Sequence, residues 1–199
     1  WDMYIQTINI DVGGFPIKMV IGYKNVDRLK SKLREYGAVF MKTDEVIELP
    51  EQIESVITVK SNKFYNQFKK DSYVDMGDTE LIGDNSLTQL LYERQLCSIY
   101  SKDKQVAFKE QLESTNYRVI VFYNFTKELD VLIDVVKSLD KPISIVNGKV
   151  RDLKAYDEES NSVTFIQYQA GSKGLNLQKA NVIIYYSPTL SAENYMQSK

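Results

Sequence analysis

The stretch that decides the fold is residues 117–140, YRVIVFYNFTKELDVLIDVVKSLD. Its first part, VIVFY, is an unbroken apolar run of strand length. Its second part places Leu129, Leu132, Ile133 and Val136 at helical spacing, with an acidic residue in the first turn. A strand that is apolar on both faces is typical of a parallel sheet covered on two sides. The stretch therefore predicts one strand–helix unit of an α/β domain.

The same alternation continues toward the C-terminus. PISIVN, SVTFIQY and NVIIYY have the composition of three further strands, and VRDLKAYDEES has that of a short helix. SAENYMQSK begins a last helix, with Ser191 as its cap and Glu193 in the first turn. Because strands alternate with helices, residues 112–199 predict a mainly parallel sheet with helices on both faces.

Residues 1–111 predict a mixed, helix-rich segment that leads into the α/β domain. VGGFP is a turn signal, MVIGY has the pattern of a short strand, and Asn25 can cap a helix over VDRLKSKLREYG. The β-branched run Val56–Val59 predicts another strand. Helical periodicity returns in SNKFYNQFKKDSYV, in SLTQLLYERQLCSIY with Asn85 or Ser86 as cap, and in KDKQVAFKEQLEST. The acidic segment DMGDTELIGDNS predicts a loop.

The composition removes several classes of chemistry. The chain has 199 residues, no histidine, one cysteine and a net charge of −2. Zinc sites built on Cys and His, Ser–His and Cys–His nucleophile pairs, and an intrachain disulfide are therefore excluded. No apolar run is long enough to cross a membrane and no signal peptide is recognisable, which predicts a cytoplasmic protein. Because the chain starts on Trp1 and stops at MQSK, we expect a fragment of a longer protein.

In an open α/β sheet, ligands bind beyond the carboxyl ends of the strands. Three loops fall there: Asn124–Thr126, Asn147–Lys149 and Ala170–Asn176. The first loop either caps its helix through Thr126 or Asn124, or contacts a nucleic-acid backbone from the helix N-terminus. The second has the sequence of a common tight turn. We expect all three loops to line one edge of the sheet.

The third loop, within QAGSKGLNLQ, is the one with the features of a phosphate-binding turn. Gly171 and Gly174 allow close backbone approach, Lys173 adds a positive charge, and Ser172 and Asn176 add neutral hydrogen-bonding groups. Such a loop suits a phosphate of a nucleotide or of a nucleic-acid backbone, or it is a simple strand-to-helix turn. It is not a G-x-x-x-x-G-K-[ST] phosphate loop, since that spacing occurs nowhere in the sequence.

Taken in order, these segments resemble the second RecA-like lobe of superfamily-two helicases of the Swi/Snf type, with their phage and prophage relatives. RVIVFYNFTKELDVL is similar to motif IV of that branch, and QYQAGSKGLNLQKANVIIYYSP is similar to motif V and its following strand. SIVNG stands where the next strand ends in a glycine turn. In the first half, GYKNVDRLKSKL, KTDEVIELPE, KFYNQFKK and LYERQLCSIYSKDK resemble the segment between the two lobes.

The chain also departs from the family pattern. Ser172 stands where the branch commonly has a second glycine, the double arginine before KTDEV is missing, and the helix after Asn147-Gly148 is short. Motif VI begins at a glutamine that resembles Gln197, and its arginines would follow Lys199. The first lobe, with its phosphate loop and Mg²⁺-holding acids, has no counterpart in the sequence. We therefore expect a lobe truncated within motif VI.

The resemblance implies an ATP-dependent DNA helicase or double-stranded DNA translocase. This lobe would contact the DNA and form one wall of the ATP cleft, with the first RecA-like lobe and DNA as partners and no membrane. ATP and Mg²⁺ belong to the full protein, and the chain alone is expected to bind neither tightly and to be inactive.

Specific roles carry over only to matching positions. The implied DNA-backbone contacts are Asn124, Phe125, Thr126, Asn147, Gly148, Gly171, Ser172 and Lys173, and the implied nucleotide-facing residues are Gly174, Asn176 and Gln197. No catalytic or metal-binding residue is assigned. Two other functions stay open at this point: a non-catalytic α/β interaction module, and the nucleotide-sugar-binding lobe of a glycosyltransferase.

Overall fold

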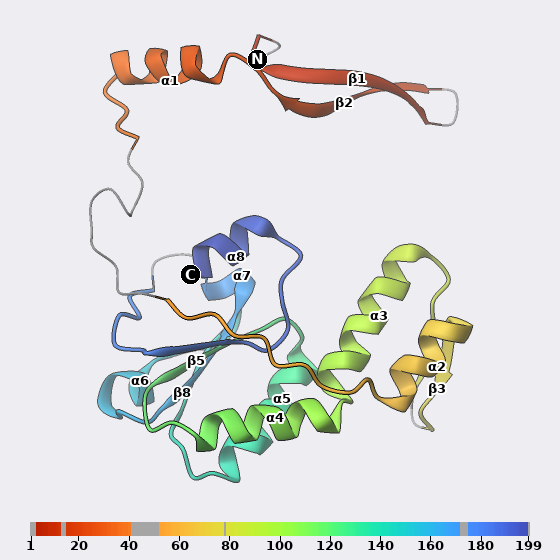
Figure 1. The fold of residues 1–199 in the computed structure, drawn as a ribbon, viewed down its shortest axis with the longest axis vertical. Coiled ribbons are helices and arrows are strands. Elements are labelled where there is room, and N and C mark those ends of the chain that lie inside the picture. Colours follow the sequence, from red (N-terminus) through yellow and green to blue (C-terminus); the bar gives the residue numbers. More distant parts are fainter. Residues whose placement is uncertain (1–2, 13–14, 41–51, 78, 172–174, 199) are drawn as a thin grey trace. The chain divides into compact units, whose positions relative to one another are not determined.

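A computed structural model of the chain describes residues 3–12, 15–40, 52–77, 79–171 and 175–198 (Figure 1). The chain divides into two compact units, Trp1–Ser55 and Val56–Lys199. The predicted division between residues 111 and 112 lies inside the second unit. No helix in the described ranges is long and apolar enough to cross a membrane.

The first unit is a two-stranded hairpin followed by one helix. β1 (Ile5–Val12) pairs antiparallel with β2 (Phe15–Tyr23), and α1 spans Val26–Glu35. The predicted helix is present, and the predicted strand MVIGY is the end of β2. Asn25 precedes α1, but its side chain donates to the carbonyl oxygen of Met3 (3.0 Å) and makes no bond to the helix. Asn25 therefore occupies the predicted N-cap position, but its side chain does not cap the helix, because the amide ties the helix start to the hairpin instead.

Helices and a short hairpin lead from the start of the second unit into its sheet. These elements are α2 (Lys63–Asp71), β3 (Tyr73–Asp75), β4 (Glu80–Ile82), α3 (Ser86–Ile99) and α4 (Lys102–Glu113). The predicted helices are present, with Asn85 as the cap of α3. Two expectations are wrong. Val56–Val59 forms no strand, since no strand among the described residues pairs with it. The acidic segment is not only a loop, because it carries β4 and the last residue of β3.

The second unit is built on a five-stranded sheet with the order β7-β6-β8-β5-β9. Its strands are β5 (Val119–Tyr123), β6 (Ile143–Val146), β7 (Arg151–Asp152), β8 (Val163–Gln167) and β9 (Val182–Tyr185). The remaining helices are α5 (Thr126–Lys137), α6 (Lys154–Glu158), α7 (Tyr168–Gly171) and α8 (Ala192–Ser198). Four strands run parallel, and only the short edge strand β7 is antiparallel to its neighbour. The predicted α/β class with a mainly parallel sheet is confirmed.

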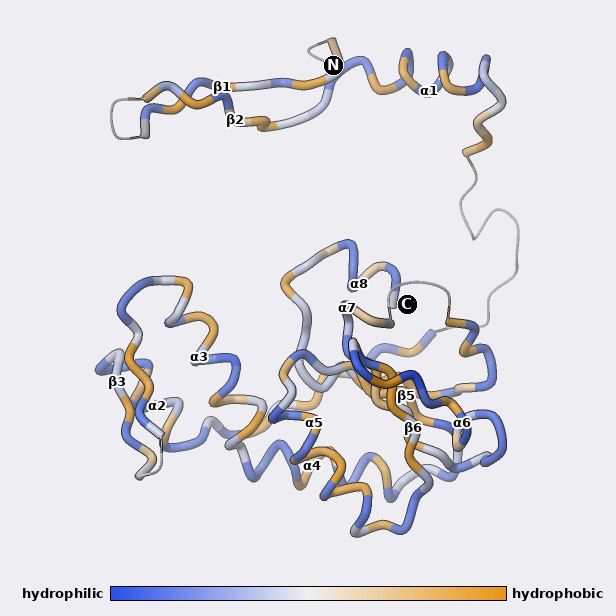
Figure 2. Tube along the Cα trace, turned by 180° about the vertical axis from the view of Figure 1, so that it is seen from behind, coloured by the Kyte–Doolittle hydropathy of each residue, from blue (hydrophilic) through white to orange (hydrophobic). Residues whose placement is uncertain are grey.

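Successive side chains of each strand enter opposite cores of this sheet. Val119, Val121 and Phe165 pack on the face covered by α4 and α5. Ile120 and Phe122 pack on the other face, under α7 and the segment that leads to β9. Figure 2 shows the result as hydrophobic colour concentrated in the central strands β5 and β6. Covered faces on both sides explain why the sequence of β5 is apolar at every position.

A third, smaller core joins α2, the β3–β4 hairpin and α3. Phe68, Val74 and Leu96 are its buried residues. The end of α3 is tied to the sheet, because the Tyr186 hydroxyl donates to the carbonyl oxygen of Ser98 (3.0 Å). This contact fixes the helical layer beside the loops that follow β5 and β9.

Candidate functional site

Loops that follow the parallel strands β5, β6 and β8 meet at one edge of the sheet. The Asn147 amide, just after β6, donates to the Tyr123 hydroxyl at the end of β5 (3.3 Å). The Gln167 amide, at the end of β8, donates to the carbonyl oxygen of Asn124 (3.2 Å). Because β8 lies between β6 and β5 in the sheet, these bonds link all three strand ends. We call this region the carboxyl edge.

The Asn124 side chain is turned inward and ties two loops together. Its amide nitrogen lies 2.7 Å from the carbonyl oxygen of Ser187, 2.8 Å from the Ser187 hydroxyl and 3.3 Å from the carbonyl oxygen of Pro188. These acceptors belong to the loop after β9. Asn124 therefore fixes the loop that carries Phe125 and Thr126, and its side-chain donors are used within the protein.

Glu128 completes this arrangement from the first turn of α5. The carboxylate is fully buried, and its Oε2 accepts bonds from the backbone N–H of Asn124 (2.9 Å) and of Phe125 (3.0 Å) and from the Ser187 hydroxyl (2.9 Å). Neither Asn124 nor Thr126 caps α5, so the capping alternative for this loop is wrong. Phe125 occupies the N-cap position and has no acceptor, and Glu128 holds the chain at this point instead.

The helical layer braces the same loop from outside. Arg94 of α3 donates to the carbonyl oxygen of Pro188 (2.7 Å), and its guanidinium lies 5.4 Å from the centre of the Phe125 ring. The Lys104 ammonium of α4 lies 4.5 Å from the centre of the Tyr186 ring. Burial lowers the pKa of Lys104, and the negative charge of Glu128 opposes that shift. Helices of the predicted inter-lobe segment thus position the loop after β5.

Sequence patterns did not predict that Glu128, Arg94 and Ser187 hold this loop. A glutamate two positions after Thr126 matches the third position of a capping box, but the phenylalanine at the N-cap hides the pattern. Arg94 lies thirty residues before Asn124 in the sequence, and no local signal connects the two. Ser187 follows a predicted strand and has an ordinary turn composition.

Several predicted contact residues present their side chains to solvent. Thr126, Asn176 and Gln197 are exposed, and Gly148 is open enough that an added Cβ would meet no atom within 4 Å. Asn147 is half-buried, and its Oδ1 accepts from the backbone N–H groups of the two residues after Gly148. The exposed groups are uncharged hydrogen-bonding groups, which suit the oxygens of a phosphate.

The loop after β8 is described only in part. Gly171 ends α7, whereas Ser172, Lys173 and Gly174 lie outside the described residues. Beyond them, Leu175 and Leu177 pack in the core under this face, and Asn176 between them is exposed.

Stacked aromatic rings support α7 and α8. Phe122 of β5 stacks on Tyr168 at 5.1 Å and on Tyr185 at 5.5 Å between ring centres, and Tyr185 contacts Tyr195 of α8 at 5.3 Å. The Tyr185 hydroxyl donates to the carbonyl oxygen of Ser198 (3.1 Å). Burial raises the pKa of Tyr168, so its hydroxyl stays protonated. These contacts fix the helix that carries Gln197, whose amide donates to Glu193 of the same helix (3.2 Å).

The described residues bring together no group of three or more metal-ligating side chains. What they offer at the carboxyl edge is a braced set of neutral donors beside the first turn of α5. The positive end of that helix dipole favours a negatively charged ligand.

Comparison with known proteins shows what the residues around this edge are similar to. Residues 103–199 match the family described as helicase conserved C-terminal domain. Over 96% of this chain, the sequence is 23% identical to the DNA repair and recombination protein RAD26 of Saccharomyces cerevisiae. Over 41% of the chain it is 33% identical to the ATP-dependent helicase fft3 of Schizosaccharomyces pombe. The expected resemblance to a helicase C-terminal domain with Swi/Snf-type relatives is thus confirmed, while the phage or bacterial origin stays a prediction.

These relatives are much longer proteins. The matched regions are 21% of RAD26 and 10% of fft3. A solved structure, the C-terminal part of the Fun30 ATPase domain, aligns with a TM-score of 0.46 and 22% identity. That alignment covers 56% of this chain and 40% of the other.

Proposed function

We propose that this chain, whose residues 103–199 match the helicase conserved C-terminal domain, is the second lobe of an ATP-dependent DNA helicase or double-stranded DNA translocase. In this role the carboxyl edge holds the DNA backbone. The side of the sheet that carries Asn176 and Gln197 forms one wall of the cleft in which ATP binds against the first lobe. The domain match is the starting point for both roles, and the DNA-dependent ATPase activity belongs to the larger protein that we propose.

The observation that carries the proposal is the braced loop Asn124–Thr126. Glu128, Ser187 and Arg94 hold it from three sides. Within the described residues, no acceptor bonds to the backbone N–H of Thr126 or of the next residue. A loop held this firmly presents free donors at a helix N-terminus, which is an arrangement that binds phosphate.

In this role the residues of this chain bind and orient the ligands and carry out no chemical step themselves. The Thr126 hydroxyl, the N–H groups of Thr126 and Lys127, and the exposed ammonium of Lys127 hold one DNA phosphate. Gly148 allows the backbone after β6 to approach the same strand closely. The aromatic stack at Tyr185 fixes α8, so that Gln197 keeps its place at the cleft wall. ATP and Mg²⁺ chemistry requires a phosphate cradle and metal ligands, which we assign to the first lobe.

The test is DNA binding by the 199-residue chain, measured by fluorescence anisotropy with a labelled duplex. We expect Lys127→Glu to weaken binding about tenfold and to reduce the slope of log K against log salt by roughly one. Lys137→Glu is the matched control, because it makes the same charge change at the other end of α5, where the residue is also exposed.

Equal affinity of the two variants would contradict the proposed backbone contact. Gly148→Ala adds a second probe, since an added Cβ meets nothing in the fold and any loss reports on the ligand. Binding of a nucleoside diphosphate sugar in place of DNA would instead favour the glycosyltransferase alternative.

A further inference from the structure

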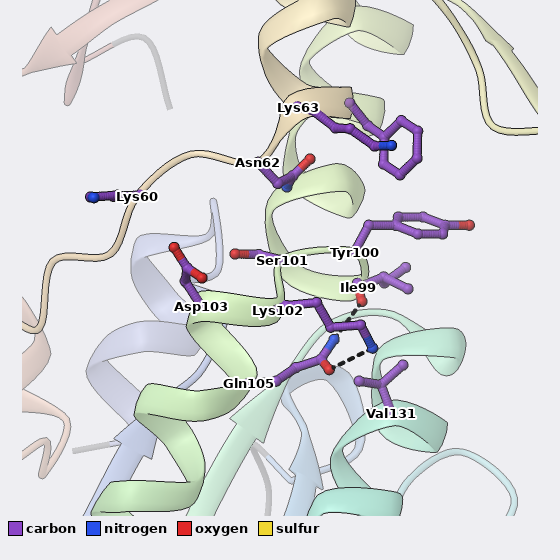
Figure 3. Close-up of a pocket in the computed structure, with 11 residues that line it drawn as sticks. Lys60, Asn62, Lys63, Ile99, Tyr100, Ser101, Lys102, Asp103, Gln105 and Val131 are labelled. Carbon is purple, nitrogen blue, oxygen red and sulfur yellow. Dashed lines mark hydrogen bonds between the residues drawn. The ribbon is translucent and has the colours of Figure 1, made fainter.

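A groove of about 470 Å³ lies outside the carboxyl edge, where the start of α2, the corner between α3 and α4, and α5 come together (Figure 3). We call it the lysine groove. Lysine, aromatic and aliphatic side chains line it, among them Lys60, Lys63, Phe64, Tyr100, Lys102 and Val131. None of these residues belongs to the predicted DNA or nucleotide contacts.

The groove carries a net positive charge. Lys60, Lys63 and Lys102 line it, against the single carboxylate of Asp103. Within the described ranges, none of the three lysines has a carboxylate oxygen within 4.0 Å. The Lys102 ammonium donates to Gln105 Oε1 (3.2 Å), which holds it at the end of the groove beside α5. These positive charges are therefore available to an anionic ligand.

Apolar and aromatic groups line the groove between the lysines. Phe64 and Tyr100 make an edge-to-face contact at 6.4 Å between ring centres, and the Lys63 ammonium lies 4.8 Å from the centre of the Phe64 ring. Ile99 and Val131 add aliphatic surface. A ligand that fits must combine negative charge with flat apolar surface. A nucleotide does so, because its base packs on rings while its phosphate binds the lysines.

The groove also continues the carboxyl edge. Val131 lines it from α5, and Lys127 lies four residues earlier on the same face of that helix. Lys127 and Thr126 are the exposed residues that we assign to a DNA phosphate. Lys102 lines the groove beside Val131, and Lys63 lines it from α2, so a strand that continues along α5 into the groove would meet both lysines.

We propose that the lysine groove binds the backbone and one or more bases of the nucleic-acid strand that passes the carboxyl edge. The ligand class is a phosphodiester strand, and this inference rests on the proposed function. An acidic peptide would satisfy the lysines but would make no use of the rings or of the continuity with Lys127.

The test uses Lys63→Glu combined with Lys102→Glu in the full 199-residue chain. Both positions lie in the first turn of a helix, where an acidic residue is favourable, so the fold should be retained. The control combines Lys137→Glu with Lys154→Glu, which are exposed and make the same change in net charge. We expect the groove variant to bind a labelled duplex or single strand at least about tenfold more weakly than the control, with a salt slope lower by roughly two.

The outcomes for Lys127→Glu and for the groove variant separate the proposed function from the groove inference. If Lys127→Glu weakens DNA binding and the groove variant matches its control, the groove inference fails and the proposed function stands. If only the groove variant weakens binding, the contact at the carboxyl edge fails. Loss of poly-glutamate binding without loss of DNA binding would overturn the assignment to a nucleic acid, as would a wild-type chain that binds no DNA.

Lysine acetylation read by mass spectrometry tests the same site without any variant. We expect bound DNA to protect Lys60, Lys63 and Lys102 from acetylation, while Lys137 and Lys154 react as before. Unchanged labelling of the three groove lysines under saturating DNA would overturn the proposal.

Discussion

Two strand pairs have opposite surroundings in this protein. In the first unit, β1 and β2 pair along their whole length, yet Ile5 is the one buried hydrophobic residue among the described residues of that unit. In the second unit, every residue of β5 is buried, and its partner β8 is almost as well covered. The two pairs therefore differ in how well other elements cover them.

This contrast shows where the stability of the chain originates. A two-stranded hairpin alone is marginal in water, whereas a sheet packed on both faces gains free energy from every strand residue. Ile10 pairs with Ile17 and Ile8 with Met19, so a row of apolar side chains lies along one face of the hairpin. The hairpin depends on backbone pairing, and the sheet depends on its two cores. Matched substitutions in the two units put that contrast to the test.

The largest expected difference is between two phenylalanines. Phe165 is 0% exposed in the sheet core, and Phe15 is 74% exposed at the start of β2. Phe165→Ala should lower the free energy of unfolding by about 3–5 kcal/mol through lost packing and a cavity. Phe15→Ala should change it by less than about 0.5 kcal/mol. Urea unfolding followed by circular dichroism measures both, and equal losses would mean that the hairpin is as well packed as the sheet.

The second pair compares two glutamates. Glu128 is fully buried and accepts three hydrogen bonds, so Glu128→Ala should cost about 3 kcal/mol, and Glu128→Gln less because an acceptor remains. Glu35 forms an exposed ion pair with Lys32 at 2.7 Å, with side-chain exposures of 60% and 57%. Glu35→Ala should cost about 0.5 kcal/mol or less. Thermal unfolding of the three variants tests this, and a small effect of Glu128→Ala would show that the loop does not need its buried acceptor.

For the smallest expected effect, the substitution in the first unit costs more unfolding free energy than the one in the second unit. Gly37, after α1, has φ of +87°, whereas Gly148 at the carboxyl edge has no such constraint. Gly37→Ala should therefore cost about 1 kcal/mol in backbone strain, and Gly148→Ala close to zero. Hydrogen exchange of the last turn of α1 should become about fivefold faster in the first variant. No change there would indicate that the turn after α1 relaxes without cost.

The fold was predictable where burial and sequence pattern agree. VIVFY and the spacing of Leu129, Leu132 and Val136 predict β5 and α5, since a doubly covered strand is apolar at each position. The prediction failed at Val56–Val59, because β-branched residues favour a strand only when a neighbouring strand is available to pair. It also missed the β3–β4 hairpin, whose strands are three residues each and mostly exposed.

The position of the candidate site was predictable from the sequence, but the contacts that hold its loops in place were not. Parallel topology places the loops after β5, β6 and β8 at one edge, as the strand pattern indicates. The inward direction of the Asn124 amide depends on acceptors in residues 187–188, more than sixty positions away, so local sequence cannot reveal it. The same holds for Arg94, which reaches the edge from α3. The lysine groove also forms only when residues near 60, 100 and 131 meet.

The most direct test of the proposed function is ATP turnover, measured with and without duplex DNA. The samples are the 199-residue chain alone and a longer protein that joins it to a first lobe, as the proposed function requires. We predict that DNA increases turnover by the longer protein several-fold, that Lys127→Glu removes most of this increase, and that the chain alone hydrolyses no ATP above background. Turnover by the chain alone, or a rate in the longer protein that DNA does not change, would contradict the assignment of this chain as the DNA-holding second lobe.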